Sequence, residues 1–127
     1  SANIFEGKVI SSKGGKLTVS TDVGEVFTSN GKSITEGEKI WLGLRPEKIY
    51  LSKAKPKNIG PNQIKGIVEE IGYLGETSIY KIRLKNGQII DVSAPNQSRP
   101  MSRVREITWE DMVYLNWEPE SAMLLTS

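Results

Sequence analysis

The sequence contains neither cysteine nor histidine. Without cysteine, the chain can form no disulfide bond and can offer no thiolate as a nucleophile or metal ligand. Without histidine, it lacks the commonest general base and the commonest ligand for transition metals. Ser-His-Asp and Cys-His catalytic sites are therefore excluded within this chain.

Long apolar runs are also missing. The longest runs are far shorter than the roughly 20 residues that a transmembrane helix needs. The N-terminal stretch SANIFEGKV has no charged head followed by an apolar segment, so it predicts no signal peptide. The 17 basic and 15 acidic residues leave a net charge of +2, which by itself favours neither nucleic acid nor an anionic membrane as a partner. With 37% hydrophobic residues, the chain can build the core of one domain or of two small fused units.

Short segments with alternating or β-branched residues run through almost the whole chain, separated by turn residues. Asn86-Gly87 lies between two such segments and predicts a β-hairpin with a type I′ turn. Helical signals are few. Ile107–Met112 is either a single helical turn capped by Thr108 or a loop that contacts a partner. The pattern predicts an all-β barrel or sandwich.

The chain repeats itself imperfectly. Phe5–Val9 aligns with Ile64–Val68 at an offset of 59 residues, whereas Pro46-Glu47 aligns with Pro119-Glu120 at an offset of 73. The second copy therefore carries an insertion of 14 residues, which we place in the polar segment near 95–111. Small repeats usually bury a core only against one another, so one compact unit is expected. We divide the chain into a first half at 1–52, a linker at 53–63 and a second half at 64–127.

Each Pro-Glu pair predicts a corner between two strands, because proline donates no hydrogen bond to a sheet and does not fit a central strand. Arg45 precedes the first pair and Glu118 precedes the second, so the bend itself does not need a particular charge. Arg45 and Glu47 are expected to form a polar corner that braces the two halves or contacts a neighbouring domain. Trp41 and Trp117 are expected in the core, and Trp109, in the insertion, is a candidate interface anchor.

Other chemical motifs fail on inspection. Gly31-Lys32-Ser33 resembles the end of a phosphate-binding loop, but Val26 stands where that loop needs glycine, so we predict a hairpin turn there. Glu69 and Glu70 are adjacent on a predicted strand and point to opposite faces, which excludes a shared acid–base role. Two basic stretches contain Lys48, Lys53, Lys55 and Lys57, and Arg99, Arg103 and Arg105. Too few aromatic residues accompany them to favour a nucleic-acid surface.

Four segments together resemble the C-terminal region of ATPase subunits of ABC importers. SANIFEGKV resembles the Ser-x-Asn-x-Phe-x-Gly segment that follows their nucleotide-binding domain, and LGLRPEKIYL is similar to their Leu-Arg-Pro-Glu regulatory signature. GIVEEIGYLGETSIYKIRLKNGQIIDVSAPN is similar to the transport-associated OB (TOBE) segment. TWEDMVYLNWEPESAMLLT resembles the ending typical of putrescine and spermidine importers.

The resemblance implies an OB-like β-barrel built from the two imperfect repeats. It also implies a non-catalytic, regulatory and dimer-stabilising C-terminal module of a longer, cytoplasmic subunit that lies against the inner face of the membrane. The Walker A, signature and Walker B motifs of the ATPase domain are absent here, so ATP and magnesium are expected in that domain and no cofactor in this chain. The implied partners are a second copy of the subunit, the ATPase domain and the membrane permease subunits. The signature or interface candidates are Asn3, Phe5, Gly7, Arg45, Pro46, Glu47, Tyr73, Leu74, Gly75 and Trp109.

Two other functions stay open at this point. The chain is alternatively a sensor that binds the transported small solute between its repeats; a polyamine would need carboxylates and aromatic faces, and nothing in the sequence gathers these into one pocket. An OB-type nucleic-acid binder is the third reading, and it is the least supported of the binding functions.

Overall fold

The computed structural model describes residues 2–57, 60–96 and 107–126 of the chain. These residues form ten β-strands and two 3-10 turns, with no α-helix among them, which confirms the all-β prediction. The strands are β1 (Asn3–Lys13), β2 (Lys16–Thr21), β3 (Gly24–Thr28), β4 (Lys39–Leu44), β5 (Tyr50–Ser52), β6 (Asn62–Leu74), β7 (Thr77–Arg83), β8 (Ile89–Pro95), β9 (Met112–Trp117) and β10 (Met123–Thr126). The turns are η1 (Pro46–Lys48) and η2 (Pro119–Ser121).

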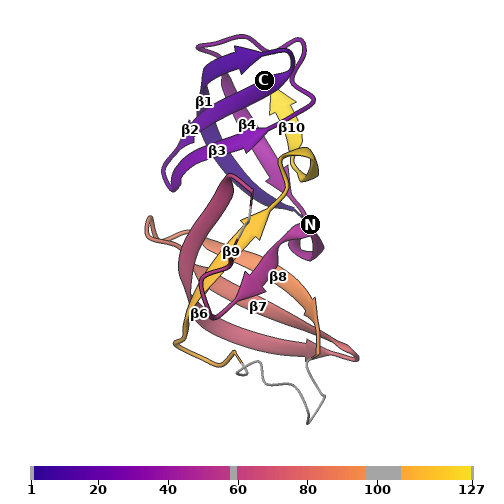
Figure 1. Cartoon of the computed structure of the whole chain (residues 1–127). Helices are drawn as coiled ribbons and strands as arrows, with labels where there is room; N and C mark the ends of the chain where they lie inside the picture. The colour runs from indigo at the N-terminus through magenta and orange to yellow at the C-terminus, as the bar shows by residue number, and fades with distance from the viewer. Residues whose placement is uncertain (1, 58–59, 97–106, 127) are drawn as a thin grey trace.

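The strands form two five-stranded antiparallel sheets, which Figure 1 shows as two units stacked end to end. The first sheet has the order β10-β4-β1-β2-β3, and the second has the order β5-β9-β6-β7-β8. We call them the first and second units. Each unit contains one strand from the other half of the sequence, since β5 pairs with β9 and β10 pairs with β4. The two repeats are thus interlocked by an exchange of one strand each.

The repeat is visible in backbone detail. β1 and β6 begin at Asn3 and Asn62, and β4 and β9 begin at Lys39 and Met112, which reproduces the two sequence offsets. Both long first strands carry a bulge at the equivalent place, between Val9 and Ser11 and between Val68 and Glu70. The connection between β8 and β9 is six residues longer than that between β3 and β4, so it holds only part of the 14-residue insertion. The other eight residues are spread over the longer β6, β7 and β8 and the turn between β7 and β8. The basic residues of the β8–β9 connection, at positions 99, 103 and 105, lie outside the described part of the chain.

Both Pro-Glu pairs form the predicted corners. The residue before each proline is extended, with φ and ψ of −69° and 141° at Arg45 and of −84° and 144° at Glu118. The chain then makes one 3-10 turn and enters the exchanged strand. Proline suits this position because its fixed φ matches the first residue of a helical turn, where the missing N–H has no partner to lose. Each corner therefore redirects the chain, so that β5 and β10 join the sheet of the opposite unit.

A continuous core fills both units and the junction between them. Alternate residues of each strand point inward, as the period of two requires. At the junction, the rings of Phe5 and Trp117 stack with centroids 6.1 Å apart and planes inclined by 9°. Trp117 is buried as predicted, but Trp41 is only half-buried, on the outer face of β4, so its assignment to the core was wrong. The alternation explains this, because Ile40 and Leu42 take the inward positions on either side of it.

Three turns differ from their predictions. In the β7–β8 hairpin, Asn86 does not have a positive φ and only Gly87 does, at 89°, so the turn is not type I′. It has a three-residue loop, in which the Leu84 N–H donates to the Gln88 carbonyl over 2.8 Å. The Gly31-Lys32-Ser33 segment is not a hairpin, because the strands on either side of it, β3 and β4, do not pair.

The segment before β9 is a β-turn and not a helical turn. The Thr108 N–H donates to the Asp111 carboxylate over 2.8 Å, whereas a helix cap would need the Thr108 side chain to accept. Glu110 has a φ of 68°, a left-handed conformation that stops a helix. The first repeat has Gly37 at this place with a φ of 95°, and the Thr35 N–H donates to the Glu38 carboxylate over 2.5 Å in the same way. The turn before β9 is therefore the counterpart of the turn before β4 in the first repeat, and it does not begin a helix.

Candidate functional site

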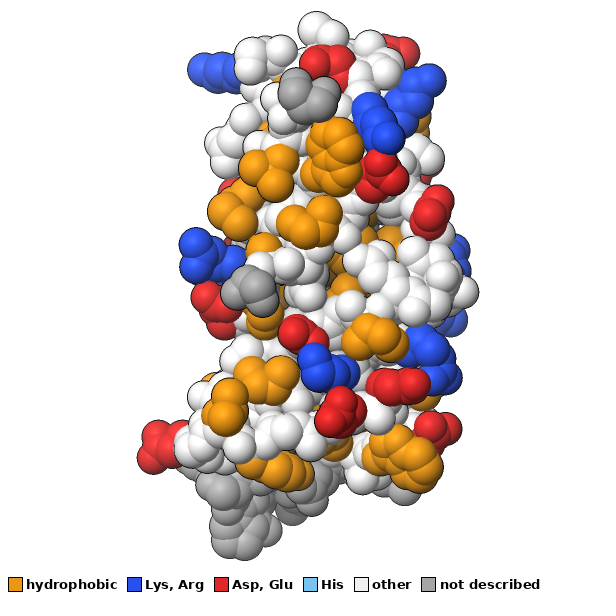
Figure 2. All heavy atoms as spheres, turned by 180° about the vertical axis from the view of Figure 1, so that it is seen from behind, with side chains coloured by type: hydrophobic (Ala, Val, Ile, Leu, Met, Phe, Trp, Pro, Cys, Tyr) orange, Lys and Arg blue, Asp and Glu red, His pale blue; other side chains and the backbone are white. Residues whose placement is uncertain are grey.

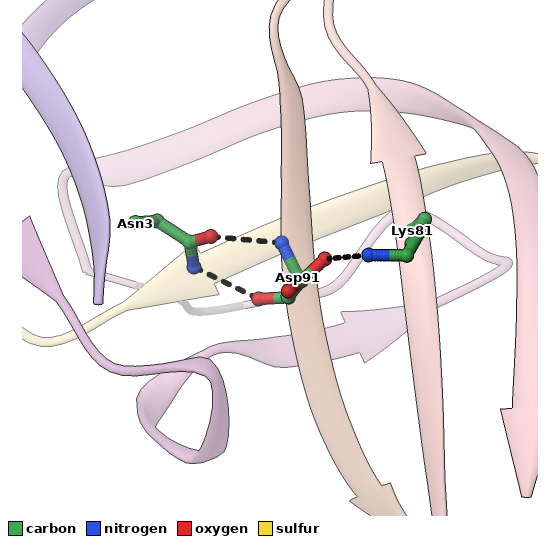
Figure 3. Close-up of polar contacts among 3 residues, drawn as sticks. All are labelled: Asn3, Lys81 and Asp91. Carbon is green, nitrogen blue, oxygen red and sulfur yellow. Dashed lines mark hydrogen bonds and ion pairs between the residues drawn. The ribbon is translucent and has the colours of Figure 1, made fainter. Parts of the chain in front are cut away.

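Asn3 ties the first unit to the second. Its side-chain Nδ2 donates to the Asp91 carbonyl over 2.8 Å, and its Oδ1 accepts from the Asp91 N–H over 2.8 Å. Figure 3 shows these two bonds side by side, with Lys81 pairing the Asp91 carboxylate from the neighbouring strand at 3.1 Å. Asp91 lies on β8, the outermost strand of the second unit. The amide of Asn3 therefore pairs backbone groups that the edge of that sheet leaves open.

Asn62 makes the reciprocal contact. Its Nδ2 donates to the Phe27 carbonyl over 2.8 Å, and its Oδ1 accepts from the Phe27 N–H over 2.8 Å. Phe27 lies on β3, the outermost strand of the first unit. Asn62 stands 59 residues after Asn3, at the equivalent place of the repeat, and is 1% exposed. A primary amide suits both sites because it offers one donor and one acceptor in a plane, as a peptide group does.

The first Pro-Glu corner faces a cavity of about 430 Å³ at the junction of the two units. Arg45, Pro46 and Glu47 line it from the corner, and Ile79 and Ser93 line it from β7 and β8. Arg45 and Glu47 are exposed, and neither forms an ion pair within the described residues. The signature residues of the corner are thus gathered beside the second unit, with their charges open to solvent.

Phe5 and Gly7 serve packing. Phe5 is buried in the stack described above. A Cβ atom at Gly7 would lie 2.5 Å from Cγ1 of Val19 and 2.7 Å from the Ser20 carbonyl oxygen, so any larger residue would push β1 and β2 apart. The equivalent Gly66 has the same constraint on β6. These two glycines are there because neighbouring strands approach closely.

The outer face of β10, β4 and β1 is apolar. Ile4, Trp41, Met123 and Leu125 lie there, and Gly43 leaves a shallow floor on which the Met123 and Ile4 side chains converge. We call these residues the apolar face. Figure 2 shows hydrophobic side chains gathered on this side of the first unit. One rim is charged, because the Lys39 ammonium pairs with Glu6 at 2.6 Å and lies 5.5 Å from the centroid of the Trp41 ring.

The remaining candidates lie in turns. Tyr73, Leu74 and Gly75 form the tip of the β6–β7 hairpin, where Tyr73 is 67% and Leu74 is 69% exposed and Gly75 has a φ of 60°. Trp109 is 63% exposed in the turn before β9. The structure does not bring the ten candidates into one site. It divides them among the junction, the close approach of β1 and β2, the first corner and two exposed turns.

Sequence reasoning missed Asn62. The alignment of the two repeats begins at Phe5 and Ile64, and extending it back by two residues pairs Asn3 with Asn62. The presence of asparagine at both equivalent positions was the signal that could have identified Asn62. Its meaning becomes clear only with the structure, because each side chain forms hydrogen bonds with a strand of the opposite repeat.

The described residues contain no group of three or more acidic side chains placed to hold a metal ion. Among the same residues, no helix is long and apolar enough to cross a membrane.

The model of the TOBE domain matches residues 42–125. The putrescine transport ATP-binding protein PotG of Escherichia coli is 35% identical over 128 residues, which is 99% of this chain and 33% of PotG. The spermidine/putrescine import ATP-binding protein PotA of Chromobacterium violaceum is 29% identical over 125 residues, 98% of this chain and 34% of that protein. The chain thus spans about a third of the length of these curated relatives.

The fold also matches a solved structure, the cytoplasmic molybdate-binding protein ModG with molybdate bound. The alignment covers 98% of this chain and 96% of that one, with a TM-score of 0.80 and 12% sequence identity. At this identity the likeness speaks for the fold alone, and it confirms the OB-like architecture. The resemblance first read from the sequence motifs is confirmed by the family model and the relatives together. The chain belongs to the TOBE domain family.

Proposed function

We propose that this chain is the non-catalytic C-terminal domain of the ATP-binding subunit of an ABC importer for polyamines. Support comes from the relatives PotG and PotA, whose names describe putrescine and spermidine import and which align along nearly the whole chain. In this proposal ATP and magnesium bind the ATPase domain, and this domain needs no cofactor of its own. The subunit works on the cytoplasmic side of the membrane, against the permease subunits.

The role we assign to the domain is regulatory and dimer-stabilising, through contact with a second copy of itself. The observation that carries this role is the apolar face on β10, β4 and β1. Its members Met123 and Leu125 are 42% and 48% exposed on adjacent positions of one side of one strand. Contiguous apolar surface of this kind marks interaction sites on soluble proteins. A two-fold dimer would place the face of one copy on the same face of the other.

Sedimentation equilibrium tests this role, with the chain measured over a range of concentrations. We expect self-association that weakens in Met123→Glu, because a buried carboxylate in an apolar contact is costly. Met112→Glu is the matched control, since Met112 is also 42% exposed but lies on β9 of the second unit. A chain that stays monomeric, or one that loses association equally in both variants, contradicts the dimer-stabilising role.

The same experiment with putrescine and spermidine examines the alternative function. A polyamine-dependent change in mass or thermal stability would favour a sensor of the transported solute, because a ligand that binds only the folded state raises its stability. Association that is indifferent to polyamine supports the structural role.

A further inference from the structure

The chain contains two Asn-Gly pairs, Asn30-Gly31 and Asn86-Gly87. This dipeptide is chemically labile, because glycine has no side chain to keep its backbone nitrogen away from the carboxamide of the asparagine before it. Attack by that nitrogen on the asparagine Cγ closes a succinimide ring and expels ammonia. Both asparagines are exposed. What separates the two pairs is how the structure holds the glycine whose nitrogen attacks.

Gly31 is fixed inside the first unit. It is buried, and its N–H donates to the carbonyl of Gly15, which is also buried, over 2.9 Å. A Cβ atom at Gly31 would lie 2.6 Å from Cδ1 of Leu17, so the backbone has little room to move. Attack on Asn30 would require this nitrogen to leave a buried hydrogen bond that water cannot replace. We expect the first pair to be stable in the folded chain.

Gly87 is open to solvent in the β7–β8 turn. It is exposed, and in the described part of the chain no atom beyond its neighbours in sequence lies within 4 Å of the place of a Cβ atom. Its N–H donates to the Leu84 carbonyl over 2.9 Å. Because Gly87 is exposed, water can satisfy this N–H when the bond opens, so the nitrogen is released at a lower cost than that of Gly31.

The side chain of Asn86 is turned towards the attacking atom. Its Oδ1 accepts a hydrogen bond from the Gln88 N–H over 3.0 Å, which is an Asx turn. The turn holds the carboxamide on the C-terminal side of Asn86, where the Gly87 nitrogen lies. A donor on Oδ1 also draws electron density from Cγ, which makes that carbon more open to attack.

We propose that Asn86 is a site of spontaneous deamidation. The Gly87 nitrogen forms a bond to Cγ of Asn86, the bond from Cγ to Nδ2 breaks, and ammonia leaves with the proton of the Gly87 N–H. Water then opens the succinimide. Opening at the former side-chain carbonyl gives aspartate, and opening at the main-chain carbonyl gives isoaspartate, whose backbone runs through Cγ. Either product replaces a neutral amide by a carboxylate, and water is the only other reactant.

The new carboxylate lies at the junction of the two units. Asn86 lines a cavity of about 310 Å³ together with Glu6 and Asp22 of the first unit, and no basic side chain of the described residues lines it. Like charges around one hollow repel one another. Beside Asn86, the Nε2 of Gln88 donates to the Ile4 carbonyl over 2.7 Å, and isoaspartate lengthens the backbone just before this contact. Deamidation therefore weakens the attachment of the β7–β8 turn to the first unit.

Incubation of the chain at mildly alkaline pH, followed by peptide mass spectrometry, tests the site, because base deprotonates the attacking nitrogen. We expect the mass change from amide to acid, with isoaspartate among the products, in the peptide that contains Asn86. Its rate should exceed that at Asn30 by about tenfold or more, the factor that breaking one buried hydrogen bond implies. In urea, where the chain is unfolded, the two pairs should react at similar rates. An Asn86 that stays intact in the folded chain, or equal rates at the two pairs there, overturns the proposal.

Asn86→Asp tests the effect on the junction, because aspartate keeps the acceptor for the Gln88 N–H and adds only a charge. We expect a lower midpoint of urea unfolding than in the wild type at low ionic strength, and a smaller difference at high salt, where charges are screened. Asn30→Asp, at an exposed residue outside the cavity, is the matched control and should leave the midpoint unchanged. Equal midpoints in the two variants overturn the effect assigned to the new carboxylate.

Discussion

Replacing Asn62 by alanine removes two hydrogen bonds between the units at a place that water does not reach. The side chain is 1% exposed, and it satisfies both the N–H and the carbonyl of Phe27 at 2.8 Å. Each bond contributes about 1 kcal/mol net, and a buried backbone group left without a partner costs about 1–3 kcal/mol. We expect Asn62→Ala to lower the free energy of unfolding by about 2–4 kcal/mol. That is a large share of the total for a domain of this size.

Urea unfolding followed by fluorescence measures this loss as a shift of the midpoint at an unchanged slope. Asn62→Asp sharpens the test. The aspartate still accepts from the Phe27 N–H, but it faces the Phe27 carbonyl with a second acceptor and buries a charge, so it should be no better than alanine. Asn116→Ala is the matched control, because Asn116 is partly buried on β9 and has no side-chain hydrogen bond in the described residues. The reasoning is refuted if Asn62→Ala costs no more than Asn116→Ala, or if Asn62→Asp behaves like the wild type.

Three further changes probe the repeat. Gly66→Ala places a methyl group against a side chain of β7, and this overpacking should lower the free energy of unfolding in urea by about 1–3 kcal/mol. An unchanged midpoint would mean that β6 and β7 can separate freely. Glu110→Gly removes a left-handed non-glycine residue, so thermal unfolding should show a gain of up to about 1 kcal/mol, and a loss would contradict the strain assigned to its φ of 68°. Trp117→Ala breaks the stack with Phe5 and should lower the free energy of unfolding by about 3–5 kcal/mol, measured by calorimetry. Trp109→Ala, at an exposed residue, should change it by no more than about 0.5 kcal/mol. Similar losses in the two variants would show that the stack at the junction does not stabilise the fold.

The sequence predicts those parts of the fold that depend on residues close together in the chain. The Pro-Glu corners follow from the geometry of proline, and the β7–β8 hairpin follows from Asn86-Gly87. The prediction of a type I′ turn was wrong because Asn-Gly also suits a three-residue loop, in which only the glycine needs a positive φ. Trp41 was misplaced because the alternation of β4 could be assigned only by deciding which of its neighbours face inward.

The strand exchange could not be predicted. Leu51 of β5 pairs with Leu115, and Leu124 of β10 pairs with Leu42. These are repeat-equivalent residues, so each strand would satisfy the pattern of either sheet. A local pairing and an exchanged pairing therefore have the same sequence signal. The contacts of Asn3 and Asn62 could not be predicted either, because the sequence does not show that a single polar residue at the start of one strand forms hydrogen bonds with the edge of another sheet.

The exchange of β5 and β10 has a consequence for synthesis on the ribosome. Met123 of β10 pairs with Gly43 of β4, so the first unit gains its edge strand only after the second repeat has been translated. Until then β4 presents an unpaired edge, the kind of surface from which aggregation begins. Contacts this distant in sequence also slow folding, since a long loop must close before they form. The nascent chain therefore passes through a partly open state, and the two repeats reach their native form together.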